Sequence, residues 1–320
     1  MPHEFLSQHI LPFARLRFSQ RRLVVSMPRP LRFQPKPWSV FFVTSRCIHS
    51  RFLLRPSSKT NALVVGVMAK AVHRFDVKLF GMCFMSNHYH LLLSSKDAAS
   101  LAQFMQYLNS NIAREIGKLH NWREKFWSRR YRATAVLDDT AVLDRMKYIL
   151  SNSVKEGLVK HPRYYPGVHC YRHLVEGRPL HGTWVNRTSM HTEPGLTESG
   201  ASEGLTLKLS RLPQYEEMSE IAYRDLIKGL TKDMLSELDK PTPVLGQKRI
   251  LNQDPLSSPR QSSKTPAPLC HTTCARLRAE FRQAFRDFVS AYKEAYTQLS
   301  RGHFKDVFPE GSIPPTAWAA

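Results

Sequence analysis

The hydrophobic and polar positions between residues 39 and 156 predict an alternation of short strands and longer helices. Four segments have the β-branched and aromatic composition that is typical of strands: 39–45, 77–84, 88–93 and 132–137. Two segments have the spacing of amphipathic helices: 60–75 and 97–119. The apolar stripe of the second helix is long and regular, and it consists of Leu101, Phe104, Met105, Leu108, Ile112 and Ile116.

A third helix is predicted after the last of these strands. Asp138 and Asp139 are suited to cap its start and to complement its dipole, and Gly157 is suited to end it. The resulting order is strand, helix, strand, strand, helix, strand, helix. This order predicts an α+β fold of the ferredoxin-like class, with an antiparallel sheet and helices on one face.

Composition divides the chain into four regions. Residues 1–37 are basic and rich in proline, which predicts an irregular arm, and Met27 is a second candidate start beside Met1. The compact domain is expected at 38–180. Serine, threonine, glycine and proline predict a linker over 181–275, interrupted by a short helix near 214–238. A helix with a partly disordered tail is expected over 276–320.

The balance of charge points to a polyanionic partner. The formal net charge is +21, from 47 lysines and arginines against 26 acidic residues, and such an excess favours nucleic acid. No run approaches the roughly 20 apolar residues of a membrane span. The five cysteines are scattered and odd in number, which argues against a disulfide framework. We therefore expect a cytoplasmic protein without a membrane partner.

The sequence His88-Tyr89-His90 is the strongest candidate for chemistry. Residues two apart in a strand point to the same side, so both imidazoles project together and Tyr89 projects to the other face. Two converging neutral imidazoles make half of a divalent-metal site. On the third helix, Tyr148 and Asn152 lie one turn apart on one face. They could supply a nucleophilic phenol beside a third metal ligand.

Three stretches together carry a family resemblance: FMSNHYHLLL at 84–93, FWSRRYRA at 126–133 and YILSNSVKEGLV at 148–159. In this order they resemble the IS200-like and REP-associated tyrosine transposases, which belong to the HUH superfamily of single-strand DNA transposases. The resemblance covers about residues 38–175. It implies that His88, His90 and Asn152 hold Mg²⁺ or Mn²⁺, and that Tyr148 attacks single-stranded DNA beside a hairpin. The protein would then associate with the nucleoid when bound to DNA.

A basic cluster follows the second helix. Arginines and tyrosine alternate between Ser128 and Arg132, which suits a surface that tracks a nucleic-acid backbone. The candidate DNA-binding residues are Arg129, Arg130, Arg132 and two lysines near the tyrosine, Lys147 and Lys155.

Two other functions remain open from the sequence. The chain could be a domesticated protein that binds hairpin DNA or RNA without cutting it, or an HUH nuclease of the replication-initiator or relaxase type. The alternative for the site is that it has no chemical role: His88 and His90 would be ordinary histidines of the sheet, and Tyr148 would pack in the core. A homodimer is a further expectation that the sequence leaves undecided, because IS200-like relatives can exchange the tyrosine helix between subunits.

Overall fold

The computed structural model of the protein describes residues 33–238, 243–259, 268–301 and 308–312. Residues 1–32, and with them Met27 and most of the expected basic arm, lie outside the described residues. The same holds for residues 239–242 and 260–267 of the expected linker.

Four antiparallel strands form the centre of the molecule. They are β1 (Ser39–Arg46), β2 (Val77–Phe84), β3 (His88–Ser95) and β4 (Arg132–Val136), arranged in the order β2-β3-β1-β4. Helix α1 (Ser58–Arg74) connects β1 to β2, and α2 (Ala98–Leu119) connects β3 to β4. This order and connectivity confirm the predicted α+β, ferredoxin-like core.

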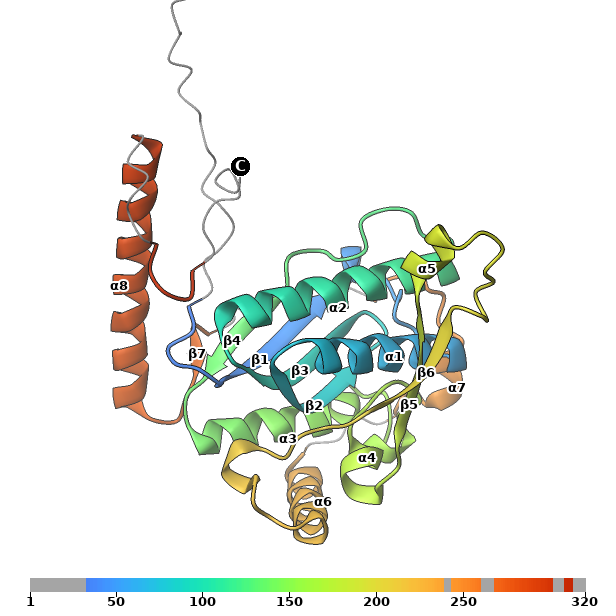
Figure 1. Ribbon diagram of the computed structural model, residues 1–320. Coiled ribbons are helices and arrows are strands. Elements are labelled where there is room, and N and C mark those ends of the chain that lie inside the picture. The colour runs from blue at the N-terminus through green and yellow to red at the C-terminus, as the bar shows by residue number, and fades with distance from the viewer. Residues whose placement is uncertain (1–32, 239–242, 260–267, 302–307, 313–320) are drawn as a thin grey trace, which may run out of the picture.

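The predicted amphipathic patterns determine how these two helices pack. Ser57 caps α1 by accepting from the Thr60 amide, and Asp97 caps α2 by accepting from the Ser100 amide. Each of the six apolar residues of the α2 stripe is at most 1% exposed. Figure 1 shows α1 and α2 lying side by side across the sheet.

Helix α3 (Asp139–Lys155) covers the opposite face of the sheet. The prediction of helices on one face is therefore correct for α1 and α2 and wrong for α3. On the first face, the Tyr89 hydroxyl donates to Asn109 Oδ1 of α2 at 2.6 Å. On the other face, the neighbouring His90 ring lies against Tyr148 of α3. Because both Tyr89 and His90 are buried, strand alternation requires a cover on each side.

Residues 180–207 fold onto the core, so the prediction of a linker here is wrong. They form β5 (Leu180–Val185), α5 (Arg187–Thr192) and β6 (Ser202–Leu207), with β5 and β6 paired antiparallel. The hairpin approaches α1 at a glycine contact: a Cβ built on Gly66 would lie 2.2 Å from the Thr183 carbonyl carbon. A Cβ on Gly182 would lie 2.1 Å from the Gly66 nitrogen. Only glycines allow this approach of two backbones.

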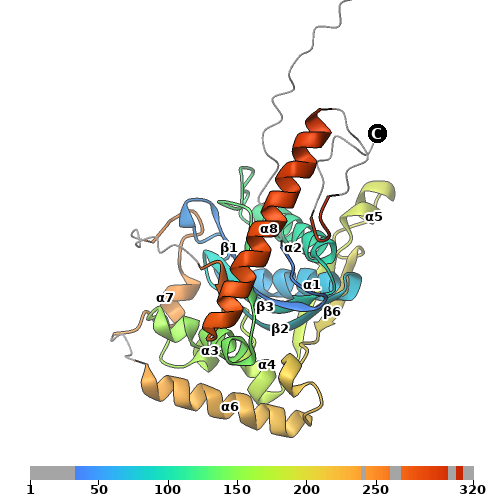
Figure 2. The ribbon, with the colours of Figure 1, turned by 90° about the vertical axis from the view of Figure 1, so that its left-hand side faces the viewer.

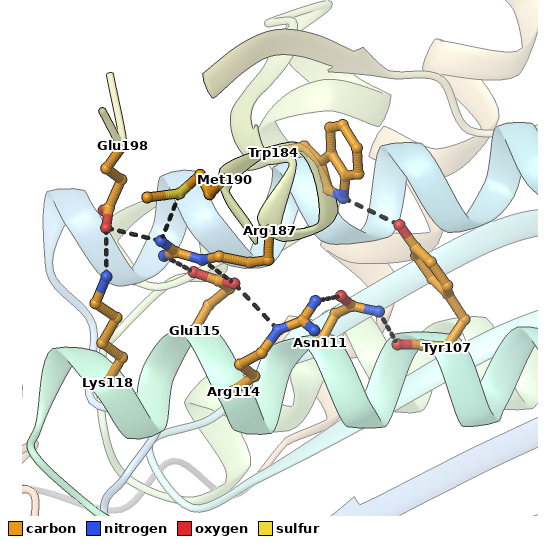
Figure 3. A network of polar contacts seen from close by, with 9 residues as sticks. All are labelled: Tyr107, Asn111, Arg114, Glu115, Lys118, Trp184, Arg187, Met190 and Glu198. Atoms are coloured by element: carbon orange, nitrogen blue, oxygen red, sulfur yellow. Dashed lines mark hydrogen bonds and ion pairs between the residues drawn. The ribbon is translucent and has the colours of Figure 1, made fainter. Parts of the chain in front are cut away.

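A buried ion-pair network fastens the same hairpin to α2 (Figure 3). Arg187 binds both carboxylate oxygens of Glu115, whose side chain is 3% exposed, and it also contacts Glu198 at 2.9 Å. Lys118 of α2 reaches Glu198 at 2.6 Å. These pairs satisfy a carboxylate that would otherwise be costly to bury.

The remaining elements lie after the core, apart from one short turn between β1 and α1. They are α4 (Tyr171–Glu176), α6 (Glu220–Glu237), α7 (Gln247–Leu251), β7 (Cys270–His271), α8 (Ala275–Ser300) and three short 3₁₀ turns at Ile48–Ser50, Pro162–Tyr164 and Pro213–Tyr215. Helices α6 and α8 confirm the two helices expected in the second half of the chain. The short β7 adds a fifth strand, parallel to β4. All five cysteines are free, as expected. In the part of the chain that the structure describes, no helix has the length and apolarity to cross a membrane.

Candidate active site

His88 and His90 project from the same face of β3, as the strand alternation predicts. Their ring centroids lie 4.9 Å apart, with the planes nearly perpendicular. The His88 ring contacts Asn87: Nδ1 and Asn87 Oδ1 are 2.6 Å apart. Because the Asn87 amide nitrogen donates to the Ser50 carbonyl oxygen, Asn87 presents its oxygen to the ring. Nδ1 of His88 therefore carries the proton, and Nε2 keeps its lone pair for a ligand.

His90 is buried under the ring of Phe42 in β1. The two rings stack at 5.3 Å, and His90 is 6% exposed. Burial, assisted by the nearby Arg46 and Arg145, lowers the pKa of His90 to about 3. Burial also lowers the pKa of His88, assisted by His90 and Arg46. Both rings are therefore neutral near pH 7, which is the form that binds metals.

Tyr148 reaches the histidines from α3. The helix begins at Asp138, whose carboxylate accepts from the Ala141 amide at 2.8 Å. The Tyr148 ring lies 5.2 Å from that of His90 and 5.5 Å from that of Phe42, edge-on to both. Burial raises the pKa of the phenol, Glu156 raises it further, and Arg145 lowers it. The structure thus brings the extended segment and the tyrosine helix together within one chain.

Asn152 follows one turn after Tyr148 and is almost completely buried, with 1% exposed. Neither its amide oxygen nor its amide nitrogen has a hydrogen-bond partner in the described part of the chain, and the same is true of both ring nitrogens of His90. Buried polar atoms normally find partners, so these residues are suited to hold a ligand. Among the described residues, no three residues of the types His, Cys, Asp and Glu are grouped to hold a metal. A metal held by the two histidines would therefore need a further ligand of another type, such as Asn.

Two arginines beside this site were missed by the sequence reasoning. The Arg145 guanidinium lies 5.5 Å from the Tyr148 ring centre and 5.7 Å from that of Phe42. Its position three residues before Tyr148 on the helix could have revealed it. Arg46 pairs with His88 across β1 and β3, and therefore projects to the same face. Finding Arg46 requires the strand register, which the sequence did not provide.

Comparison with known proteins assigns the segment that carries these residues. The model of the family described as "Transposase IS200 like" matches residues 47–152, a stretch that contains His88, His90, Tyr148 and Asn152. Residues 47–152 are thus similar to IS200-like transposases, and we refer to them as the transposase domain. No curated protein matches the chain at a significant level.

Two solved structures are similar to parts of the chain. A REP-associated tyrosine transposase bound to a REP hairpin is 15% identical, with a TM-score of 0.40, and the similarity covers 47% of this chain and 86% of that chain. A candidate transposase from Deinococcus radiodurans R1 is 14% identical, with a TM-score of 0.28 and coverage of 37% and 94%, respectively.

The predicted DNA-binding residues of the transposase domain differ in how close they lie to the tyrosine. Arg132 and His90 both pair with Thr44, from β4 and β3, so they project to the same face of the sheet. Lys155 Nζ lies 5.7 Å from the Tyr148 ring centre. Arg129 and Arg130 are exposed in the preceding loop, and Lys147 is half-buried on α3. Their roles in DNA binding stay predictions.

The far C-terminal region also reaches the transposase domain. The His271 ring of β7 lies 5.7 Å from the Phe42 ring, and burial lowers its pKa to about 4. Immediately after it, Thr272 and Thr273 bind the Asp138 carboxylate that caps α3. A strand of two residues leaves too short a pattern for the sequence to reveal this contact.

Proposed function

We propose that the transposase cleaves and rejoins single-stranded DNA, with Tyr148 as its nucleophile. The proposal rests on one observation from the matched segment. His88 and His90 project from the same face of β3, and the Tyr148 ring packs against the buried, neutral ring of His90. Packing for stability alone would leave the unpartnered nitrogens of His90 and the unpartnered amide of Asn152 unexplained.

The proposed reaction is a transesterification. The Tyr148 oxygen forms a bond to phosphorus while the bond from phosphorus to the 3′ oxygen breaks. The phenol releases its proton to solvent and the departing 3′ oxygen takes one up, so that protons balance. The products are a 5′-phosphotyrosine and a free 3′-hydroxyl. Because the phosphotyrosine keeps a phosphodiester link, a second 3′-hydroxyl can rejoin the strand without ATP.

His88, His90 and Asn152 would hold Mg²⁺ or Mn²⁺. Two nitrogen donors and one amide oxygen leave positions for water and for a phosphate oxygen, which suits either ion. Such an ion supplies charge neutralisation at the scissile phosphate. In the chain itself, Asn87 fixes the tautomer of His88, and the Phe42 ring excludes water from around His90.

DNA is the proposed substrate, with its cleavage position beside a hairpin, as the resemblance implies. Arg46, Arg132 and Arg145 support this, because they bring positive charge to the face of the sheet that carries the histidines. The proposed set of site residues lies within one chain, so a monomer could carry it; a homodimer stays a proposal. We place the activity in the cytoplasm, at the nucleoid.

The test is capture of the covalent adduct. Single-stranded oligonucleotides, tiled across the DNA that flanks the gene and labelled at their 3′ ends, are incubated with protein in Mg²⁺, in Mn²⁺ or in EDTA. We expect a labelled protein band with either ion and none in EDTA. Tyr148→Phe should abolish the band, whereas Tyr164→Phe, at a tyrosine that is 50% exposed, should keep it.

A band that persists in Tyr148→Phe would remove Tyr148 from the role. Binding of the same oligonucleotides by wild-type protein, without cleavage in either ion, would instead favour the domesticated binding protein.

A further inference from the structure

Helix α8 lies outside the matched transposase segment. Its own surface has three faces: one apolar, one basic and one acidic. At about 100° per residue, its apolar positions fall on one side. Phe281, Phe288, Tyr292 and Ala295 on this side are buried. Phe33 packs on it, with ring centroids 5.4 Å from Phe281 and 5.2 Å from Phe288. The apolar face is therefore covered, and the other two faces remain for solvent or a partner.

The second face carries positive charge alone. We call it the basic stripe; it consists of Arg278, Arg282, Arg286 and Lys293, all exposed and within an arc of about 80°. Glu280, Asp287 and Glu294 lie on the opposite side of the helix, at about 160–200° from Arg278. None of the four cations forms an ion pair with another described residue, whereas Arg276, on the acidic side, pairs with Glu280.

This separation of charge works against the stability of the helix. Like charges at i and i+4, as at Arg278, Arg282 and Arg286, repel one another, and mixing the two signs along one face would remove that cost. A solvated helix has no reason to keep such an arrangement, but a helix that binds a polyanion does.

The basic stripe begins beside the first turn of the helix that carries Tyr148. Arg278 Nη2 donates to the Thr272 carbonyl oxygen at 3.0 Å, and Thr272 in turn contacts Asp138, the cap of the tyrosine helix. Figure 1 shows α8 standing beside β7, at the edge of the sheet, and Figure 2 shows it running on past the body of the protein. From Arg278 to Lys293 the stripe spans about 22 Å, at a rise of about 1.5 Å per residue.

We propose that the basic stripe binds the phosphate backbone of double-stranded DNA, as a docking surface for the stem of a hairpin. About 22 Å corresponds to roughly six base pairs at 3.4 Å each. Between Arg278 and Lys293 the arc of the stripe contains no aromatic side chain, and Tyr296, which follows in the same arc, is half-buried. Surfaces for single strands instead combine positive charge with aromatic stacking. The apolar face packs against Phe33, which leaves no such face for a lipid surface. The inference rests on the proposed function, because a stem along α8 would place its foot near the start of the helix that carries Tyr148.

The experiment measures how binding depends on salt. The stripe variant is Arg282→Ala/Arg286→Ala/Lys293→Ala, which keeps Arg278 and its contact with Thr272. The control variant, Lys228→Ala/Lys232→Ala/Arg276→Ala, removes three exposed positive charges elsewhere. Both are made with Tyr148→Phe, so that no probe is cut. The probes are a fluorescent hairpin with a ten-base-pair stem and an equally long strand without self-complementarity. Alanine favours helix, so α8 should remain folded, which circular dichroism checks.

For the hairpin, we expect the slope of log K against log salt to be shallower by about 2.7 in the stripe variant, at about 0.9 per lost phosphate contact. The control variant should keep the wild-type slope, and the single strand should bind equally to all three proteins. An unchanged slope in the stripe variant overturns the proposal. So does an equal loss on the single strand, or a loss of binding to phosphatidylglycerol vesicles while the hairpin slope is unchanged.

Failure of the proposed function is seen separately. The stripe variant with Tyr148 intact should still form the covalent adduct on an oligonucleotide without a stem. If wild-type protein forms no adduct but the hairpin slope depends on the stripe, the cleavage reaction is refuted and the docking surface stands.

Discussion

Asn152 is a residue whose placement favours function over stability. Its amide is 1% exposed and unpartnered within the described ranges, and an unpaired buried group costs about 1–3 kcal/mol. We therefore predict opposite effects for Asn152→Leu, a change of similar size. In EDTA the free energy of unfolding should rise by about 1–3 kcal/mol, while adduct formation with Mn²⁺ should be lost. Urea unfolding and the adduct assay measure the two effects.

Asn109→Leu is the matched control for this prediction. The Asn109 oxygen accepts from the Tyr89 hydroxyl at 2.6 Å, so this substitution removes a hydrogen bond of a buried hydroxyl and should destabilise the protein. If Asn152→Leu destabilises the protein as much as Asn109→Leu does, then the Asn152 amide has partners within the fold and its role as a ligand is wrong.

Arg145 is the cation that we expect to contribute most to the reaction at Tyr148. Its guanidinium lies over the phenol ring, its Nε has no hydrogen-bond partner among the described residues, and it is half-buried. Removal of a fixed charge that meets the developing charge of a transition state costs on the order of 100-fold in rate. Arg145→Gln should slow single-turnover cleavage by about that factor, and Arg145→Lys by less.

The control for Arg145→Gln is Lys160→Gln, at an exposed lysine five residues after the end of α3. It should change the rate by less than about threefold, as expected of a screened surface charge. Equal effects of the two substitutions on rate would mean that net charge, rather than the position of Arg145, matters.

At the scale of elements, the contact between α1 and the β5–β6 hairpin depends on two glycines. A methyl group on Gly66 would lie 2.2 Å from the Thr183 backbone, which cannot move as a side-chain end can. We predict that Gly66→Ala lowers the free energy of unfolding by at least about 1–3 kcal/mol, the usual cost of overpacking. Gly204→Ala, in the same hairpin with no atom within 4 Å of its added methyl, should be nearly neutral in urea unfolding.

At the scale of the whole molecule, the sequence predicted those parts of the fold that local patterns determine. The α2 stripe and the cap of α3 at Asp138 are decided within a few residues, and both were predicted correctly. The hairpin at 180–207 was missed because its polar and glycine-rich sequence packs through backbone contacts with Gly66 rather than through an apolar stripe. In the site, spacing along β3 and α3 predicted the candidate residues, but the cover by α3 on the second face depends on tertiary packing.

The segment between β7 and α8 binds the tyrosine helix at the carboxylate of its cap, Asp138. The hydroxyls of Thr272 and Thr273 both donate to Asp138, and the Thr273 amide donates to it at 2.9 Å. Asp138 also accepts from Ala141, in the first turn of the helix. These bonds hold the end of α3 nearest to β7, and they connect α8 to the helix that carries Tyr148.

Thr272→Val/Thr273→Val removes both hydroxyl bonds and keeps the shapes of the side chains. We predict faster hydrogen exchange at the Ala141 and Val142 amides, and a loss of about 1–3 kcal/mol in unfolding free energy, because bonds to a charged acceptor are strong. Thr192→Val, which removes an exposed local bond in α5, should leave exchange in α3 unchanged. Unaltered exchange at Ala141 in the double variant would show that α3 keeps its start without the two threonine hydroxyls.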